Sequence, residues 1–347
     1  MLHYSATLYA MGQKENVASI VRALLAKGKG ILAADESTTT MNKRLESVGA
    51  MTTLEMRHEY RELLFTAPGI EQYLSGVILY DESIKSKTSE GTPFADLLTA
   101  RGIIPGIKVD KGTVPLEMFS GEVVTEGLDG LAEHLAEYYE LGARFTKWRA
   151  VVSVDEGLPT DESLKMNAVM LARYAALSQA VGMVPIVEPE VMLHGDHSIV
   201  QAQEATTRTL QTLFATLTEY RVDLASLILK SSMVLAGDAY KEQSSPEEVA
   251  DATLRTFNLC VPKEVPGIVL LSGGQTPKRA TENLQEIARH GAQSWPITFS
   301  YSRALEEPVL TAWKGSAANK DVAQHALLHR LMLNAKAQMG DYEADLE

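Results

Sequence analysis

Charged and polar side chains follow eight short apolar runs of this sequence, and their types suggest carbonyl chemistry. The side chains at the ends of these runs are Asp35, Asp81, Lys108, Lys147, Arg149, Glu188, Lys230, Ser272 and Ser300. A lysine that is crowded by other cations and partly removed from water gives up its proton more easily. The neutral amine can then attack a ketone or aldehyde and form a Schiff base, while a carboxylate such as Glu188 carries protons during the loss of water. Lys108, Lys147 and Lys230 are all open candidates for the nucleophile, and structural Lys–Glu ion pairs are the alternative interpretation.

The elements that must position these side chains are the apolar runs themselves, which lie at residues 30–35, 76–81, 103–108, 144–149, 184–188, 227–230, 267–272 and 295–300. Near-continuous apolar runs are typical of strands buried on both faces, as in parallel sheets. Helical patterns lie between them, for example Leu128, Leu131, Leu135 and Tyr138 on one face. This alternation of strand and helix predicts an α/β protein with eight βα units. We expect a single (β/α)8 TIM barrel, and an open doubly wound sheet is the alternative.

The predicted barrel forms a single catalytic domain that spans residues 1–347. This range includes a short N-terminal extension and a frayed acidic tail that is expected from about residue 334. In parallel barrels the active site lies at the carboxyl ends of the strands. Lys147 and Arg149 are two residues apart, as are Glu188 and Glu190, so each pair should point to one face of its strand. Three lysines, an arginine and at least two carboxylates then converge on one mouth.

Two segments have the character of phosphate sites. Ser272–Lys278 follows the seventh run and precedes a helical pattern, so its small residues let backbone N–H groups approach an anion. Arg303, just after the eighth run, could supply a guanidinium fork. A second group after the first run comprises the hydroxyls of residues 37–40 and the cations Lys43 and Arg44, although such hydroxyls are also common helix caps. Two anion sites on either side of a lysine predict a bisphosphorylated carbonyl substrate.

Composition narrows the functional classes further. The chain of 347 residues has 45 acidic and 32 basic side chains and a formal net charge of −13, which argues against a general nucleic-acid surface. No apolar run is long enough to span a bilayer and no signal peptide is visible, so we expect a cytoplasmic protein without membrane association. The single Cys260 permits no internal disulfide. His194 and His197 with one carboxylate fall short of a zinc site, and we predict no metal.

Seven ordered segments of the chain resemble the class I (Schiff-base) fructose-bisphosphate aldolases. They are Gly28–Thr38, Pro105–Asp110, Lys147–Arg149, Val184–Glu190, Gly195–His197, Leu271–Gln275 and Phe299–Arg303. The resemblance implies that Lys230 is the Schiff-base lysine and Glu188 the proton shuttle, with Asp35 and Lys147 assisting at the carbon skeleton. It implies that the phosphate next to the ketone is bound by Ser272, Gly273, Gly274, Ser300 and Arg303. Around the sugar and its other phosphate it places Ser37, Thr40, Arg44 and Lys108.

The resemblance implies reversible cleavage of D-fructose 1,6-bisphosphate to dihydroxyacetone phosphate and D-glyceraldehyde 3-phosphate, in glycolysis and gluconeogenesis. In this reaction Lys147 and Arg149 would stabilise developing negative charge, and the iminium would replace metal or cofactor chemistry. The resemblance also implies a homotetramer. The alternatives are a catalytically silent barrel that binds sugar phosphates or protein partners, and another Schiff-base barrel enzyme such as a transaldolase.

Three features of the sequence depart from the pattern of the family. Ser231 and Ser232 follow Lys230 where many relatives have Pro and Asn, and Ser302 replaces a usual glycine beside Arg303. Tyr342 lies five residues from an acidic end, whereas the animal enzymes end in a tyrosine that visits the active site. A terminal tyrosine is therefore not expected to act in the same way here.

Overall fold

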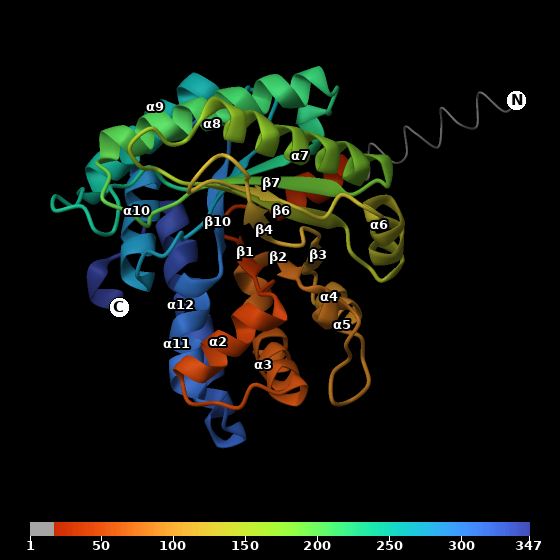
Figure 1. Ribbon diagram of the computed structural model, residues 1–347. Coiled ribbons are helices and arrows are strands. Elements are labelled where there is room, and N and C mark those ends of the chain that lie inside the picture. Colours follow the sequence, from red (N-terminus) through yellow and green to blue (C-terminus); the bar gives the residue numbers. More distant parts are fainter. Residues whose placement is uncertain (1–16) are drawn as a thin grey trace, which may run out of the picture.

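Eight parallel strands close into a barrel that is surrounded by helices, as the computed structural model shows for residues 17–347 (Figure 1). Around the barrel the strands are β1 (Gly30–Ala33), β2 (Leu74–Leu79), β3 (Ile104–Lys108), β6 (Phe145–Val152), β7 (Val184–Val191), β8 (Ile228–Ser231), β9 (Ile268–Leu270) and β10 (Ile297–Tyr301). β10 pairs with β1 and closes the ring. The prediction of a (β/α)8 barrel is confirmed, and each of the eight apolar runs overlaps one strand. The predicted N-terminal extension lies outside the described residues.

Helices cover the outer face of the barrel and connect successive strands (Figure 1). They are α2 (Thr38–Ser47), α3 (Leu54–Thr66), α4 (Asp81–Ile84), α5 (Phe94–Ala100), α6 (Leu131–Glu140), α7 (Asp161–Ala180), α8 (Ile199–Glu219), α9 (Pro246–Cys260), α10 (Pro277–Arg289), α11 (Arg303–Trp313) and α12 (Lys320–Met339). Most of the longer ones begin at a side-chain cap of the usual type, such as Ser198 in a capping box at α8. A hairpin of β4 (Thr113–Pro115) and β5 (Val123–Thr125) lies between β3 and β6.

A buried phenylalanine, Phe145 at the start of β6, helps to fill the amino-terminal part of the barrel interior. The ring of Phe145 fills the space beside Gly106 and Gly76, where a Cβ atom would lie 2.3 Å and 3.1 Å from ring atoms. Phe299 of β10 packs instead in the apolar layer between the strands and the helices, and its ring lies 2.3 Å from the place that a Cβ atom of Gly30 would take. These contacts require glycine at all three strand positions, because any side chain there would overlap a buried ring. A ligand can therefore enter the barrel from the carboxyl ends of the strands.

The predicted frayed tail from residue 334 is wrong, because the last helix α12 continues to Met339 and ends at Gly340 in the left-handed conformation. Beyond it, Tyr342 is buried, and Gln285 of α10 donates hydrogen bonds to its carbonyl and to that of Gly340, both at 2.9 Å. Arg330 of α12 pairs with Glu347 at 2.6 Å. The acidic composition of this segment suggested a solvated end, but Arg330 supplies a buried countercharge.

No helix in residues 17–347 is both long and apolar enough to cross a bilayer.

Candidate active site

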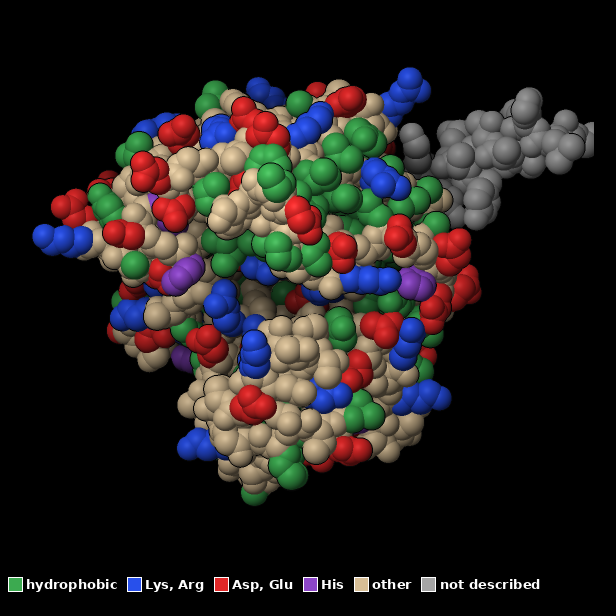
Figure 2. Space-filling view, in the orientation of Figure 1, with side chains coloured by type: hydrophobic (Ala, Val, Ile, Leu, Met, Phe, Trp, Pro, Cys, Tyr) green, Lys and Arg blue, Asp and Glu red, His purple; other side chains and the backbone are tan. Residues whose placement is uncertain are grey.

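A cavity of about 910 Å³ opens at the carboxyl ends of the barrel strands. Figure 2 shows a hollow near the centre of the molecule, with Lys and Arg side chains around it. Every predicted catalytic or substrate-binding residue except Gly274 lines this cavity. Residues from all eight strands or from the loops that follow them contribute to it, as expected for the catalytic mouth of a parallel barrel.

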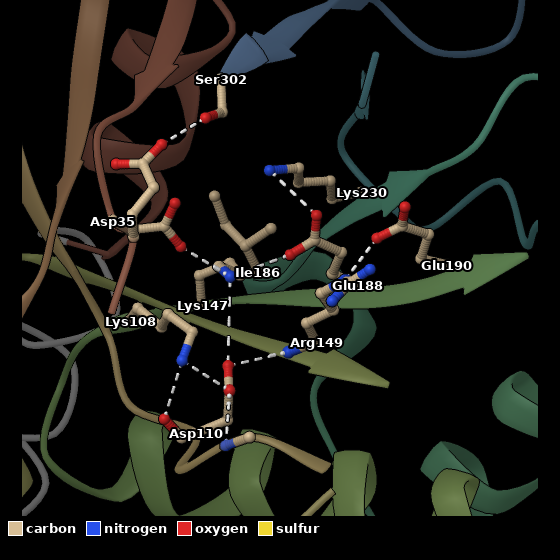
Figure 3. A network of polar contacts seen from close by, with 12 residues as sticks. Asp35, Lys108, Asp110, Lys147, Arg149, Ile186, Glu188, Glu190, Lys230 and Ser302 are labelled. Atoms are coloured by element: carbon tan, nitrogen blue, oxygen red, sulfur yellow. Dashed lines mark hydrogen bonds and ion pairs between the residues drawn. The ribbon is translucent and has the colours of Figure 1, made fainter. Parts of the chain in front are cut away.

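A lysine at the centre of the cavity, Lys147 of β6, is surrounded by carboxylates (Figure 3). Its Nζ lies 2.7 Å from Asp35 Oδ2, 3.1 Å from Glu188 Oε2 and 4.0 Å from Asp110 Oδ2. The other oxygen of Glu188 lies 3.0 Å from Nζ of Lys230, at the end of β8. All of these side chains are buried. Glu188 therefore bridges two lysines that the sequence predicts to be catalytic.

The electrostatics of Lys147 differ from the expectation that crowding by cations would favour a neutral amine. Burial alone would lower the pKa of Lys147, but the negative charges of Asp35, Glu188 and Asp110 outweigh it and raise the pKa well above its usual value. Burial would likewise raise the pKa of Asp35, but Lys147 and Lys230 hold it well below its ordinary range. The same two lysines lower the pKa of Glu188. Lys147 is thus a fixed cation, which argues against it as the nucleophile.

Two further cations of the cavity are paired with carboxylates. Lys108 Nζ lies 2.7 Å from Asp110 Oδ1 and donates to the Asp110 carbonyl at 3.0 Å. Arg149 pairs with Glu190 of β7, and its backbone N–H donates to Asp110 Oδ2 at 3.2 Å. The predicted geometry of the strand ends holds, since Lys147 and Arg149 both line the cavity, as do Glu188 and Glu190. Asp110 therefore contacts three of the cations that line the mouth.

The loop between β9 and α10 has the backbone of an anion site. Gly273 and Gly274 have φ angles of +58° and +95°, which other residues rarely adopt, and they turn the chain between Ser272 and the helix. A Cβ atom at Gly274 would lie 3.3 Å from the guanidinium of Arg303, so this side chain approaches the loop closely. Ser300 Oγ is buried at the cavity wall and has no hydrogen-bond partner among the described residues. An unpaired hydroxyl, a glycine turn and a guanidinium together suit a phosphate.

Across the cavity, the first turn of α2 carries the second set of predicted ligands. Ser37 caps this helix by accepting a hydrogen bond from the Thr40 N–H, and the two hydroxyl oxygens lie 3.1 Å apart. Arg44, one turn further along, contacts Glu36 at 2.5 Å. The capping interpretation of Ser37 is therefore confirmed, while its hydroxyl still lines the cavity. Arg44 also lines the cavity but is held by a carboxylate.

Sequence reasoning missed three acidic residues of this site. Asp110 follows Lys108 by two residues, and Glu36 follows Asp35, so the strand-end rule could have included both. Glu306 lies on α11, and no motif marks it. Asp110, together with Asp35 and Glu188, places negative charge around Lys147, which is the reason that the expected depression of the Lys147 pKa does not occur.

The two histidines considered as metal ligands lie apart from the site. His194 is exposed and its Nδ1 lies 3.2 Å from Asp238, whereas His197 is buried in the loop after β7. Within residues 17–347, no group of three or more His, Cys, Asp or Glu side chains is placed to hold a metal ion.

Fold and site together define a barrel with buried lysines between carboxylates and with two groups of polar and cationic residues whose chemistry suits phosphates. The sequence profile of the glycolytic family described as fructose-bisphosphate aldolase class-I matches residues 16–347. A probable fructose-bisphosphate aldolase class 1 of Xanthomonas axonopodis pv. citri is 49% identical over 95% of this chain and 99% of its own length. Fructose-bisphosphate aldolase 1 of Toxoplasma gondii is 46% identical over 94% and 91%.

A solved structure of fructose-bisphosphate aldolase from Plasmodium falciparum, in complex with TRAP and a small-molecule inhibitor, superposes with a TM-score of 0.94. It is 43% identical and covers 96% of both chains. The chain therefore belongs to the class I fructose-bisphosphate aldolases, the lyases that cleave D-fructose 1,6-bisphosphate reversibly through a lysine Schiff base in glycolysis. A silent scaffold and a transaldolase-like enzyme are not supported.

Proposed function

We propose that Lys230 forms the Schiff base with the C2 ketone of fructose 1,6-bisphosphate and that Glu188 transfers the protons of this step. One observation carries the proposal: the two oxygens of Glu188 lie 3.0 Å from Lys230 and 3.1 Å from Lys147. Lys147 is held in its charged form by three carboxylates, while Lys230 has one carboxylate within 4 Å in the described part of the chain. Of the two lysines that Glu188 bridges, Lys230 is thus the one with the fewer carboxylate contacts, and its carboxylate partner is the proposed proton shuttle.

The reaction then follows from the positions of these groups. The amine of Lys230 adds to the carbonyl carbon, and Glu188 protonates the departing hydroxyl so that water leaves and an iminium remains. A carboxylate of this cluster, Glu188 or Asp35, accepts the proton of the C4 hydroxyl. The C3–C4 bond breaks, and its electron pair moves into the iminium to give an enamine. Glyceraldehyde 3-phosphate leaves, the enamine is protonated at C3, and water releases dihydroxyacetone phosphate from Lys230.

The remaining cavity residues bind and orient the substrate in this proposal. Ser272, Gly273, Gly274, Ser300 and Arg303 bind the phosphate next to the ketone, and the glycine turn and the unpaired Ser300 hydroxyl support this assignment. On the opposite wall, the other phosphate and the sugar hydroxyls are bound by Ser37, Thr40, Arg44 and Lys108. Lys147, a buried cation, and Arg149, a partly exposed one, stabilise negative charge that develops on the sugar oxygens.

Borohydride reduction tests the nucleophile directly. With fructose 1,6-bisphosphate present, borohydride should fix a triose or hexose phosphate on the peptide that contains Lys230 and abolish activity. The K230M variant should lose both turnover and labelling but keep its fold, because methionine is an apolar side chain of similar length. K241M, which replaces an exposed lysine, is the matched control and should behave as the wild type. Labelling at another lysine, or full turnover of K230M, would contradict the assignment.

We further propose that the chain forms a homotetramer in the cytoplasm, and that sugar bisphosphate and triose phosphates, without nucleic acid, are its partners. The sequence similarity to relatives of known family supports this proposal, as does the acidic net charge of −13. Light scattering of the full chain gives the mass of the assembly, and a mass of one or two chains would contradict the tetramer.

A further inference from the structure

Three buried charged residues and the half-buried Arg44 form a cluster at the α2 wall of the cavity. Arg44 of α2 and Arg61 of α3 lie between the carboxylates of Glu36 and Glu306, and Ser302 completes the group. The Ser302 hydroxyl donates to Glu36 Oε1 at 2.5 Å (Figure 3) and accepts from Arg44 at 3.0 Å. Arg44 lines the cavity, so the charge of the whole cluster acts on a ligand bound beside it.

The two carboxylates of this cluster are not equivalent. Each oxygen of Glu36 has a guanidinium at 2.5 Å, one from Arg44 and one from Arg61. Glu306 is fully buried, and its contacts to the same two guanidiniums are longer, at 3.2 Å and 4.0 Å. Its Oε1 has no hydrogen-bond donor among residues 17–347. Both cations therefore mainly neutralise Glu36, and the ionised form of Glu306 is poorly compensated.

We propose that Glu306 binds and releases a proton and thereby sets the net positive charge that Arg44 presents to the phosphate remote from the ketone. This inference rests on the proposed assignment of the Arg44 wall to that phosphate. With Glu306 protonated, Arg44, Arg61 and Glu36 leave the cluster with one net positive charge. With Glu306 ionised, the cluster is neutral. Glu306 is thus a positioning and specificity residue that acts through Arg44.

The surroundings of Glu306 give the direction of its titration. Burial and the negative charge of Glu36 raise the pKa of Glu306 to about 8, although Arg61 and Arg44 oppose this shift. Asp35 also raises it, and the hydroxyl of Tyr60 on α3 lies 3.4 Å from Oε2. Glu306 is consequently protonated at neutral pH, and the attraction for the remote phosphate is lost as the pH rises through about 8.

Substrates with one and two phosphates separate this effect from other titrations. The KM for fructose 1,6-bisphosphate divided by the KM for fructose 1-phosphate should rise about tenfold between about pH 7 and about pH 9.5, since one cationic charge near the second phosphate disappears. In E306Q, which cannot ionise, the ratio should stay constant. E307Q is the matched control, because it removes an exposed carboxylate one residue further along the same helix, and its ratio should rise as in the wild type. A constant wild-type ratio, or the same rise in E306Q, overturns the proposal.

A second measurement uses the wild-type chain and does not depend on the folding of a variant. Calorimetry in two buffers of different ionisation enthalpy measures the proton taken up when the uncleavable hexitol 1,6-bisphosphate binds at about pH 8.5. More proton uptake than with hexitol 1-phosphate supports the proposal, and equal uptake overturns it. Borohydride labelling of Lys230 in the same preparations tests the proposed function separately: if labelling fails, the Schiff-base assignment is wrong, whatever the KM ratio.

Discussion

Replacing Lys147 by methionine removes the one cation that lies among three carboxylates. Coulomb's law at an effective dielectric constant of about 20 gives roughly 6, 5 and 4 kcal/mol for its contacts at 2.7, 3.1 and 4.0 Å, before the cost of taking the charges out of water. The measured cost of removing one partner from a buried ion pair is smaller, about 3–5 kcal/mol. Because methionine fills nearly the same volume, we expect K147M to lose about that much free energy of unfolding at neutral pH, without a cavity.

The pH dependence of this loss follows from the carboxylates left behind. In the wild type, Lys147 lowers the pKa values of Asp35 and Glu188. These two carboxylates therefore stabilise the folded state above their unfolded pKa of about 4. That stabilisation is lost as the pH falls through their lower pKa values in the folded state. In K147M that contribution is missing, and the buried carboxylates bind protons at higher pH. The difference in the free energy of unfolding between K147M and the wild type should therefore become smaller as the pH is lowered from about 7.5 to about 5.

Thermal unfolding at one protein concentration measures both effects. K165M is the matched control, since Lys165 pairs with Glu219 at 3.0 Å on the surface, where such a pair is worth about 0–1 kcal/mol. The double variant D35N/K147M should be more stable than K147M, because it removes one unpaired buried charge. The reasoning is refuted if K147M is as stable as K165M, or if its deficit grows toward pH 5.

Three further variants probe other parts of the site and its support. G274A should raise the KM for substrate about tenfold, because its Cβ would lie 3.3 Å from a guanidinium, whereas G291A, with a similar positive φ but open space, should leave the KM unchanged. E188Q should lower turnover by about 10²–10⁴-fold and slow borohydride labelling, while its circular dichroism spectrum stays the same as that of the wild type. Rapid labelling would argue against Glu188 as the proton shuttle. R330L should lower the unfolding temperature and make the C-terminus sensitive to carboxypeptidase, because Arg330 pairs with Glu347 at 2.6 Å. If R330L resists carboxypeptidase as well as the wild type does, this ion pair does not anchor the C-terminus.

The barrel could be predicted from the sequence because its strands are buried on both faces. An apolar run such as residues 184–188 must then be followed by polar residues where the strand reaches the mouth, so the run marks both the element and the site. Strand lengths were less accessible: the run at 144–149 belongs to a strand that continues to Val152, because the charged Arg149, with which the run ends, lies within the strand.

The charge balance of the site could not be predicted in the same way. A position at a strand end shows that Lys147 reaches the mouth, but it does not show which carboxylates turn back toward it. Asp110 lies beyond the end of β3 and its side chain returns to contact Lys108 and Arg149. Glu306 comes from a helix more than 250 residues away from Arg44 in sequence. Such contacts depend on barrel closure and on loop conformation, which local patterns do not encode.

The different environments of the two central lysines follow from their neighbours in the barrel. Lys147 lies on β6 between β3, whose extension carries Asp110, and β7, which carries Glu188, so carboxylates approach it from both sides. Lys230 lies on β8, where β7 again supplies Glu188 but the register partner on β9 is Val269. The apolar β9 therefore leaves Lys230 with a carboxylate on one side alone. Strand order, rather than the lysines themselves, surrounds Lys147 with carboxylates from both sides and gives Lys230 its contact with Glu188 alone among the described carboxylates.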